Sequence, residues 1–535
     1  MSTTTNLIAQ RLARAGCRHA FGIPGGEVLA MMQSLESSGI RFRLCRHENA
    51  GGFMAEGTFH ATGAPGILLA TIGPGLVNGI NTVVNAWHDQ VPLIVLSGCM
   101  DSATAQSYTH QVFEQTEVMR PITKGSFTMA DGAVDLMIDK AVSIAIADPQ
   151  GPVHVDIPVA LADREQPTGR RASTAPVTVV APAAGPDLDQ ARAKLARAER
   201  PVMIGGVGAV AHDAGAVITE ICERFSMPFI ATYKAKGLLP DDHPLSLGGH
   251  GLSPKSDAII LPLIKQADCI LLAGYDPIEM RAGWIDPWDP AIAIDLPHAV
   301  IRHGMHGAAL SFPGNVTAGL AAVTDDIHPR DKSWPNGEPA RVREALASAF
   351  AVPTTWGPHQ AFAAARRASP SDTVVTVDSG AHRILLSQMW TCLSPRTLLQ
   401  STALCTMGVA LPLAIGYKLS RPDTPVLAIM GDAGLEMVAG ELATLRDLRL
   451  PMAIMVMVDR SLALIELKQR ASGRPNLGVN FGRTDFAALA EAMGGIGREI
   501  TDPETLEQEL AAAYARDRFT LLACDIGAAA YDDAF

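Results

Sequence analysis

Short apolar runs alternate with stretches of helical periodicity along most of this chain. In the first third these runs cover residues 67–72, 92–97 and 153–157, and glycine or proline borders each of them. Continuous aliphatic runs of this length are typical of strands that are covered on both faces of a parallel sheet. Because helical stretches separate the runs, the pattern predicts repeated strand–helix units in an open parallel sheet.

Two stretches interrupt this pattern. Residues 163–186 gather Pro, Thr and Arg and lose periodicity, and a stretch dotted with Pro and Trp covers about 325–358. Both are typical of linkers between domains. The apolar runs return at residues 201–206, 227–232, 269–274, 291–296, 373–378, 425–432 and 451–459.

The chain is therefore expected to be an α/β protein with three doubly wound parallel-sheet domains. We expect these domains to span residues 1–165, 186–330 and 359–535. The N-terminal segment MSTTTNLIAQRLARAG predicts the start of a helix and does not resemble a signal peptide, so a cytoplasmic location is expected.

Composition excludes several classes of function. Of the 535 residues, 48% are hydrophobic and 18% are charged, and the charged fraction lies below the roughly 25% of an ordinary soluble domain. We therefore expect part of the surface to be buried between subunits. The net charge of −12, with no block of Lys and Arg, argues against a nucleic acid partner. No apolar run approaches the roughly 18 residues of a membrane span, so no membrane contact is expected.

The eight cysteines are scattered singly along the chain. They form no CxxC pair and show no spacing that suggests a zinc site. Reduced thiols in a reducing compartment are expected.

The most informative stretch is Gly431-Asp432-Ala433-Gly434, which ends an apolar run. A second acid, Asp459, ends the next apolar run. Two carboxylates at the carboxyl ends of two parallel strands, beside a glycine turn and a helix start, can hold a divalent cation and a diphosphate together. Taken alone, the motif also fits two acids that only cap helices.

The spacing resembles the cofactor motif of thiamin-diphosphate-dependent enzymes, in which Gly-Asp-Gly is followed one strand later by Asn. The resemblance implies that Asp432, the Asp459 side chain and the Ser461 backbone carbonyl bind Mg²⁺. Gly431, Ala433 and Gly434 would lie against the cofactor. Ala433 and Asp459 depart from the usual Gly and Asn of this motif.

Residues 401–416 extend the resemblance to the acetolactate synthase and 2-oxo acid decarboxylase family. In this family a Thr-Met-Gly segment, here residues 406–408, supplies a large apolar side chain that bends the cofactor. Met407 would have this role, and the backbone carbonyl of Cys405 would accept a hydrogen bond from the cofactor's 4′-amino group. The resemblance places the diphosphate against Ser379, Gly380, Ala381 and His382.

Segments of the first domain match the same family in order. Glu48, in the sequence RHEN and expected at the end of a strand, corresponds to the catalytic glutamate that hydrogen-bonds the pyrimidine of the cofactor. His110 and Gln111 correspond to a pair whose amide contacts substrate oxygens. Further cofactor contacts are implied for Pro24, Gly73 and Asn78.

The middle domain carries Gly206-Val207-Gly208 after an apolar run, which is a weak match to a dinucleotide fingerprint. No acidic residue follows at the end of the next run. Residues 274–279, the acid Asp459 and the His-Gln pair resemble the FAD-independent, catabolic acetolactate synthases. We therefore expect thiamin diphosphate and Mg²⁺ as cofactors and no FAD.

The resemblance implies a carboligase that decarboxylates a 2-oxo acid, such as pyruvate, and joins the remainder to a carbonyl acceptor. It also implies a homodimer or homotetramer whose active site lies between subunits, with Glu48 from one and the metal motif from another. Two alternatives stay open. One is a simple 2-oxo acid decarboxylase that releases an aldehyde, and the other is a non-catalytic homologue that binds thiamin diphosphate or a dinucleotide.

Three residues depart from the synthases. Glu27, which we place among the catalytic candidates, stands where Ala or Lys is usual, and a carboxylate there would repel a substrate carboxylate unless it is protonated or paired. Arg460 and Lys468 would instead recognise an anionic or longer substrate tail. A side chain that faces solvent is the alternative for each.

Overall fold

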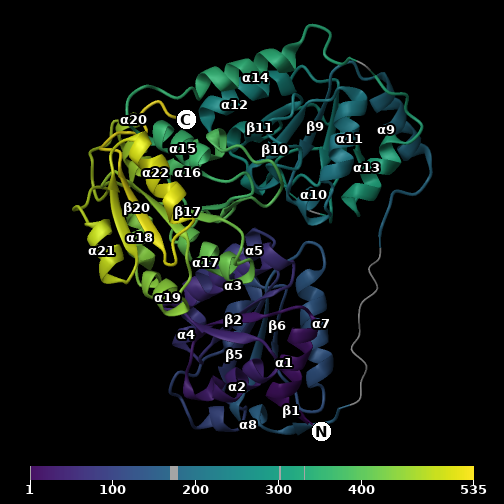
Figure 1. Cartoon of the computed structure of the whole chain (residues 1–535). Helices are drawn as coiled ribbons and strands as arrows, with labels where there is room; N and C mark the ends of the chain where they lie inside the picture. The colour runs from purple at the N-terminus through teal and green to yellow at the C-terminus, as the bar shows by residue number, and fades with distance from the viewer. Residues whose placement is uncertain (1, 169–178, 301–302, 331) are drawn as a thin grey trace.

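The computed structural model describes residues 2–168, 179–300, 303–330 and 332–535. Three six-stranded sheets, each built from parallel strand pairs and flanked by helices, follow one another along the chain (Figure 1). The predicted α/β class with three doubly wound sheets is confirmed. We call the parts around these sheets the N-terminal, central and C-terminal domains.

The N-terminal domain has the strand order β3-β2-β4-β5-β7-β6. Helices lie on both faces of this sheet, and the predicted N-terminal helix is α1, which the Thr3 hydroxyl caps by accepting from the Asn6 amide. The strands are β2 (His19–Ile23), β3 (Arg41–Leu44), β4 (Gly66–Ala70), β5 (Leu93–Cys99), β6 (Gly125–Thr128) and β7 (Val153–Pro158). The helices are α1 (Thr4–Arg14), α2 (Leu29–Ser37), α3 (Glu48–Thr62), α4 (Pro74–Asn78), α5 (Ile80–His88), α6 (Gln115–Met119), α7 (Val134–Ile146) and α8 (Val159–Ala162).

The central domain has the order β11-β10-β9-β12-β13-β14. Its strands are β9 (Pro201–Gly205), β10 (Phe229–Thr232), β11 (Ser246–His250), β12 (Cys269–Ala273), β13 (Ala293–Leu296) and β14 (Leu310–Ser311). Its helices are α9 (Pro186–Arg197), α10 (Val207–Ala211), α11 (Gly215–Phe225), α12 (Pro254–Ile264), α13 (Val316–Thr324) and α14 (Glu338–Ala349).

The C-terminal domain has the order β16-β15-β17-β18-β20-β19. Its strands are β15 (Val374–Val377), β16 (Leu398–Gln400), β17 (Val426–Gly431), β18 (Ala453–Val458), β19 (Ile496–Ile500) and β20 (Thr520–Asp525). Its helices are α15 (Pro358–Ala368), α16 (Ala381–Met389), α17 (Ala410–Ser420), α18 (Asp432–Val438), α19 (Glu441–Leu448), α20 (Ala463–Ala471), α21 (Phe486–Ala492) and α22 (Pro503–Ala513).

Each apolar run that predicted a strand coincides with one, with shifts of one or two residues at the ends. Both predicted linkers contain regular secondary structure. In the first, β8 (Glu165–Gln166) pairs antiparallel with β1 (Ser2–Thr3), and residues 169–178 lie outside the described part of the chain. The prediction for the second was wrong in part, because this stretch contains α14, which packs against α12.

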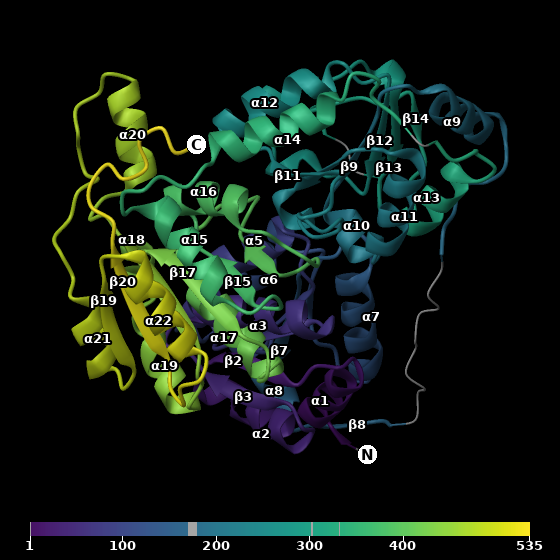
Figure 2. The same cartoon turned by 45° about the horizontal axis from the view of Figure 1, so that its top comes forward.

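The N-terminal and C-terminal domains meet where α3 packs against α17 (Figures 1 and 2). Glycines bring the two backbones into contact. A Cβ atom at Gly57 would lie 2.2 Å from the Leu413 carbonyl oxygen, and one at Gly416 would lie 1.8 Å from the Met54 carbonyl oxygen. Side chains at these positions would force the helices apart.

We expect Gly416→Ala to lower the urea midpoint of unfolding, because the added methyl group overpacks a backbone contact and costs about 1–3 kcal/mol or more. Gly482→Ala is the matched control, since a Cβ there meets no atom within 4 Å. Denaturation followed by tryptophan fluorescence checks both variants. Equal midpoints for Gly416→Ala and the unchanged protein would contradict the proposed constraint.

Candidate active site

A cavity of about 220 Å³ lies at the carboxyl ends of β15, β17 and β18. Ligands of open α/β sheets bind at this edge, where the strand order changes direction. The cavity brings together every cofactor and metal candidate that the sequence placed in the C-terminal domain, namely Ser379, Gly380, Ala381, His382, Cys405, Met407, Gly431, Asp432, Ala433, Gly434, Asp459 and Ser461. Its other lining residues are Met457, Leu462, Ala463, Leu464, Ile465 and Tyr531.

The two acids are held side by side by backbone amides. Asp432 begins α18, and its Oδ2 accepts hydrogen bonds from the amides of Asp459 at 3.1 Å and Arg460 at 2.7 Å. Asp459 Oδ1 accepts from the Ser461 amide at 3.0 Å. Burial, together with the charge of Asp432, raises the pKa of Asp459 to about 7. A divalent cation would relieve this repulsion between the buried carboxylates.

Three buried polar atoms in this cavity have no hydrogen-bond partner among the described residues. They are Ser379 Oγ, His382 Nε2 and Tyr531 Oη. Burial lowers the pKa of His382 to about 3, so its imidazole is neutral. Buried polar groups normally find partners, and these atoms fit a site that is completed by a polar ligand such as a diphosphate.

The loop that carries Cys405 and Met407 is anchored by Asp378. This buried carboxylate accepts from the amides of Gly408 at 3.0 Å and Val409 at 2.8 Å. Burial raises the pKa of Asp378 to about 6. Gly434 lies so close that a Cβ there would be 2.1 Å from Asp378 Oδ2. The packing thus fixes the loop against the start of α18.

Arg383 reinforces the same loop. Its guanidinium donates to Cys405 Sγ at 3.2 Å and to the Ser401 carbonyl oxygen at 2.5 Å. The sequence reasoning did not find Asp378, Arg383 or Tyr531. The carboxylate at the end of β15 was the one available signal, because it has the same strand-end position as Asp432.

The candidates of the N-terminal domain form a second group at the carboxyl ends of β2 and β4. Glu48 is 4% exposed and accepts from Asn78 Nδ2 through Oε2 at 3.1 Å. It begins α3, so its expected position at a strand end was wrong; β3 already ends at Leu44. A Cβ at Gly75 would lie 2.6 Å from Thr71 Cγ2 and 3.2 Å from Glu48 Oε1, so a side chain there would force its neighbours to shift.

Glu27 is paired within this group. Its Oε1 accepts from the Ile72 amide at 2.7 Å and from the Thr71 hydroxyl. The neighbouring Gly73 amide donates to Gln115 Oε1 at 2.8 Å. His110 and Gln111 lie on an exposed loop, and Pro24 is exposed as well.

The N-terminal group does not line the cavity of the C-terminal group. None of the candidates Pro24, Glu27, Glu48, Gly73, Asn78, His110 and Gln111 lines the C-terminal cavity. Asn81 links residues next to the two groups, because its Nδ2 donates to Asn49 Oδ1 and to Thr406 Oγ1, both at 3.1 Å.

Arg460 and Lys468 do not line this cavity either. The Arg460 guanidinium forms an ion pair with Asp525 at 3.3 Å, and Lys468 is exposed on α20. The structure therefore gives neither side chain a place in the cavity.

The described residues contain no group of three or more His, Cys, Asp or Glu side chains arranged to hold a metal ion. Across the same residues, no helix is both long enough and apolar enough to cross a membrane. The pair Asp432 and Asp459 would therefore need oxygen ligands from a bound diphosphate to complete a magnesium site.

Comparisons with known proteins agree over most of the chain. Three family models of thiamine pyrophosphate enzymes match it: the N-terminal TPP binding domain over residues 2–118, the central domain over 188–323 and the C-terminal TPP binding domain over 378–524.

Several curated proteins align with this chain over nearly the full length of both sequences. Acetolactate synthase of Bacillus subtilis is 29% identical over 94% of this chain and 90% of its own. Acetolactate synthase isozyme 3 large subunit of Escherichia coli is 28% identical over 97% and 93%. A probable 2-ketoarginine decarboxylase of Pseudomonas aeruginosa is 29% identical over 97% and 93%.

Proposed function

Because the chain belongs to the thiamine pyrophosphate enzymes, we propose that it decarboxylates a 2-oxo acid and joins the remainder to a carbonyl acceptor, as an acetolactate synthase does. The observation that carries the proposal is the single cavity that gathers Asp432, Asp459, three unpartnered polar atoms and Met407. Near full-length similarity to acetolactate synthases supports the same activity.

The residues present fit the cofactor. Thiamin diphosphate supplies, when bound, a thiazolium ring that accepts electrons from the substrate as CO₂ leaves. Asp432, Asp459 and the Ser461 carbonyl would hold Mg²⁺, and residues 379–382, with backbone amides at the start of α16, would hold the diphosphate. Met407 would support the bend of the cofactor, and the Cys405 carbonyl would accept from its amino group. No FAD is proposed.

Glu48 would act on the pyrimidine ring of the cofactor. Its buried carboxylate, fixed by Asn78, would hydrogen-bond the ring nitrogen and hold or release a proton there. Since Glu48 does not line the C-terminal cavity of its own chain, we propose that each active site combines this cavity with the partner subunit's Glu48. Gln111 and His110 would contact the substrate from the same side.

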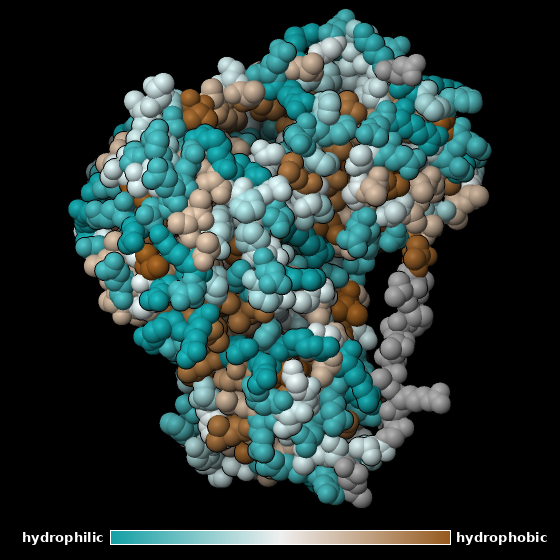
Figure 3. All heavy atoms as spheres, viewed as in Figure 1, coloured by the Kyte–Doolittle hydropathy of each residue, from teal (hydrophilic) through white to brown (hydrophobic). Residues whose placement is uncertain are grey.

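A subunit contact has further support. Large apolar side chains are exposed near both groups, including Val77 at 45%, Met437 at 64% and Ile465 at 44%. Figure 3 shows apolar residues on the surface where the N-terminal and C-terminal domains meet. We propose a homodimer or homotetramer, with domains at residues 1–165, 186–330 and 359–535.

One observation favours a second candidate, a 2-oxo acid decarboxylase for a cationic substrate. Glu27 places a carboxylate among the catalytic candidates, where it accepts hydrogen bonds from the Thr71 hydroxyl and the Ile72 amide. A negative charge there would attract a guanidinium or ammonium group on the donor. The similarity to a probable 2-ketoarginine decarboxylase points the same way.

The test incubates the protein with thiamin diphosphate, Mg²⁺ and pyruvate, and then with longer and cationic 2-oxo acids, and follows CO₂ and organic product together. CO₂ with a hydroxy-ketone supports the carboligase. CO₂ with free aldehyde, above all from a cationic donor, supports the decarboxylase instead. Tight metal-dependent cofactor binding without turnover of any acid would reject both and favour a non-catalytic role.

A further inference from the structure

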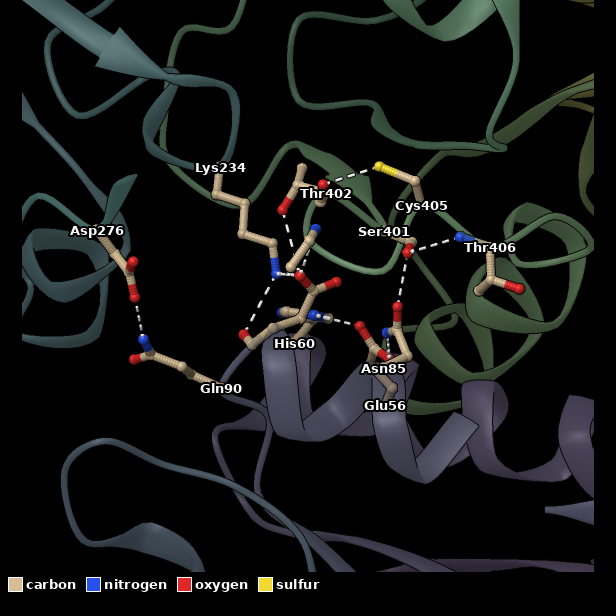
Figure 4. A network of polar contacts seen from close by, with 12 residues as sticks. Glu56, His60, Asn85, Gln90, Lys234, Asp276, Ser401, Thr402, Cys405 and Thr406 are labelled. Carbon is tan, nitrogen blue, oxygen red and sulfur yellow. Dashed lines mark hydrogen bonds and ion pairs between the residues drawn. The ribbon is translucent and has the colours of Figure 1, made fainter. Parts of the chain in front are cut away.

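A second, smaller cavity of about 50 Å³ lies where the three domains meet. Phe59 and His60 of α3 line it from the N-terminal domain, together with Asp89 and Gln90. Lys234 contributes from the central domain (Figure 4). Arg396 and residues 398–400 contribute from the C-terminal domain. A single water needs at least roughly 10–15 Å³, so this cavity has room for a few waters or one small ligand.

Several polar atoms around this cavity lack partners in the described structure. They are Gln400 Nε2, Asp89 Oδ2 and His60 Nδ1. Gln400 and Asp89 are each 4% exposed. Gln400 Nε2 offers hydrogen atoms, whereas Asp89 Oδ2 is an acceptor, so a ligand that satisfies both must combine acceptor oxygens with a hydroxyl.

The charges around the cavity leave a cation without a direct partner. Lys234 Nζ pairs with Asp89 Oδ1 at 3.0 Å. The Arg396 guanidinium lies 5.4 Å from the Phe59 ring centroid and has no hydrogen bond or ion pair with any described residue. Burial lowers the pKa of Arg396, and the charge of Asp213 offsets this only in part. One positive charge therefore borders the cavity without a contacting anion.

We propose that this cavity binds a small oxyanion that carries a hydroxyl group, of the class of bicarbonate or hydrogen phosphate. Its oxygens would accept from the Arg396 guanidinium and from Gln400 Nε2, and its O–H would donate to Asp89 Oδ2. Charge-assisted hydrogen bonds from a guanidinium are among the stronger contacts in proteins.

Asp89 also connects this cavity to the cofactor loop. Its Oδ1 accepts from Thr402 Oγ1 and from the Ala403 amide, both at 3.2 Å. The Cys405 thiol donates to the Thr402 carbonyl oxygen at 2.9 Å (Figure 4). Cys405 lines the larger cavity. Occupancy of the anion site would thus change the affinity for a ligand of the larger cavity, and the reverse.

The test is equilibrium dialysis in sealed cells, with labelled bicarbonate or labelled phosphate. The protein is saturated with thiamin diphosphate and Mg²⁺, so that phosphate cannot enter the diphosphate site. We expect one anion per chain. Arg396→Met and Gln400→Leu should each weaken its binding about tenfold or more, because each removes a hydrogen bond to a charged group. Arg396→Lys should restore part of the affinity.

Three controls distinguish binding in this cavity from effects of lost positive charge, unfolding or non-specific anion binding. Arg518→Met removes an exposed arginine that pairs with Asp517 outside the cavity, and should leave anion binding unchanged. Circular dichroism confirms that each variant is folded. Nitrate, which has no hydroxyl, should displace the label at least about tenfold less well than the unlabelled anion.

The outcomes decide the proposal. Binding of either labelled anion that depends on Arg396 and Gln400 supports it, and the two labels show which anion is preferred. Absence of binding, binding unchanged in both variants, or displacement by nitrate as effective as by the anion itself would overturn it. The bicarbonate arm is repeated without cofactor, so failure of thiamin diphosphate to bind would be recognised separately.

Discussion

Glu48→Gln should leave the folded oligomer and its affinity for thiamin diphosphate intact, while it slows exchange of the cofactor's C2 proton by about 10²- to 10⁴-fold. Glutamine has the size of glutamate and can keep a hydrogen bond with Asn78. It cannot exchange a proton with the pyrimidine ring. The measurement is exchange of the C2 proton into deuterated buffer by NMR, with cofactor affinity from titration calorimetry.

Glu56→Gln is the matched control. Glu56 lies on the same helix, is 2% exposed, and accepts from Asn85 Nδ2 at 3.0 Å. We expect its substitution to lower stability without slowing proton exchange, since it contacts His60 rather than a candidate site residue. Normal exchange in Glu48→Gln would rule out the assigned role.

Asp432→Ala should weaken magnesium-dependent binding of thiamin diphosphate by about 100-fold or more. Supporting residues around a metal already contribute 10- to 100-fold, and Asp432 would be a direct ligand. The substitution also removes the acceptor of two backbone amides that join β17 to the turn after β18. Calorimetric titration of the cofactor with and without Mg²⁺ gives the affinities.

Asp459→Asn separates the loss of charge from the loss of a ligand. Its amide oxygen can still bind Mg²⁺, so we expect affinity within about tenfold of the unchanged protein. Asp459→Ala should behave like Asp432→Ala. If Asp432→Ala keeps its magnesium-dependent affinity, the two acids are helix caps and not metal ligands.

The C-terminal half of the candidate site could be predicted well because its position follows from the sheet. Asp432 and Asp459 end apolar runs, and the carboxyl ends of neighbouring parallel strands meet at one edge. The roles of these residues remain predictions. The N-terminal candidates were found by motif alone. The expectation that Glu48 and the metal motif of one chain serve different active sites came from the family resemblance and not from the pattern of residues.

Other site residues and elements could not be predicted, because they depend on tertiary contacts that leave no pattern in the local sequence. Tyr531 lines the cavity, and Arg383 contacts the Cys405 loop beside it, only through tertiary packing. The edge strand β19 is partly exposed and carries Arg498 and Glu499, so it lacks the continuous apolar run that marks a central strand. Helix α14 was hidden in a stretch whose Pro and Trp residues suggested a linker.

The backbone contact between α3 and α17 has a mechanical consequence. Helix α3 begins at Glu48, and α17 begins directly after the loop of Met407. In the proposed assembly these ends serve different active sites, since Glu48 completes the partner's cavity. The two backbones are in direct contact at Gly57 and Gly416, with no side chain between them. A shift of one helix must therefore move the other. Each subunit would then couple two reaction centres mechanically, so that a movement at one centre is transmitted to the other.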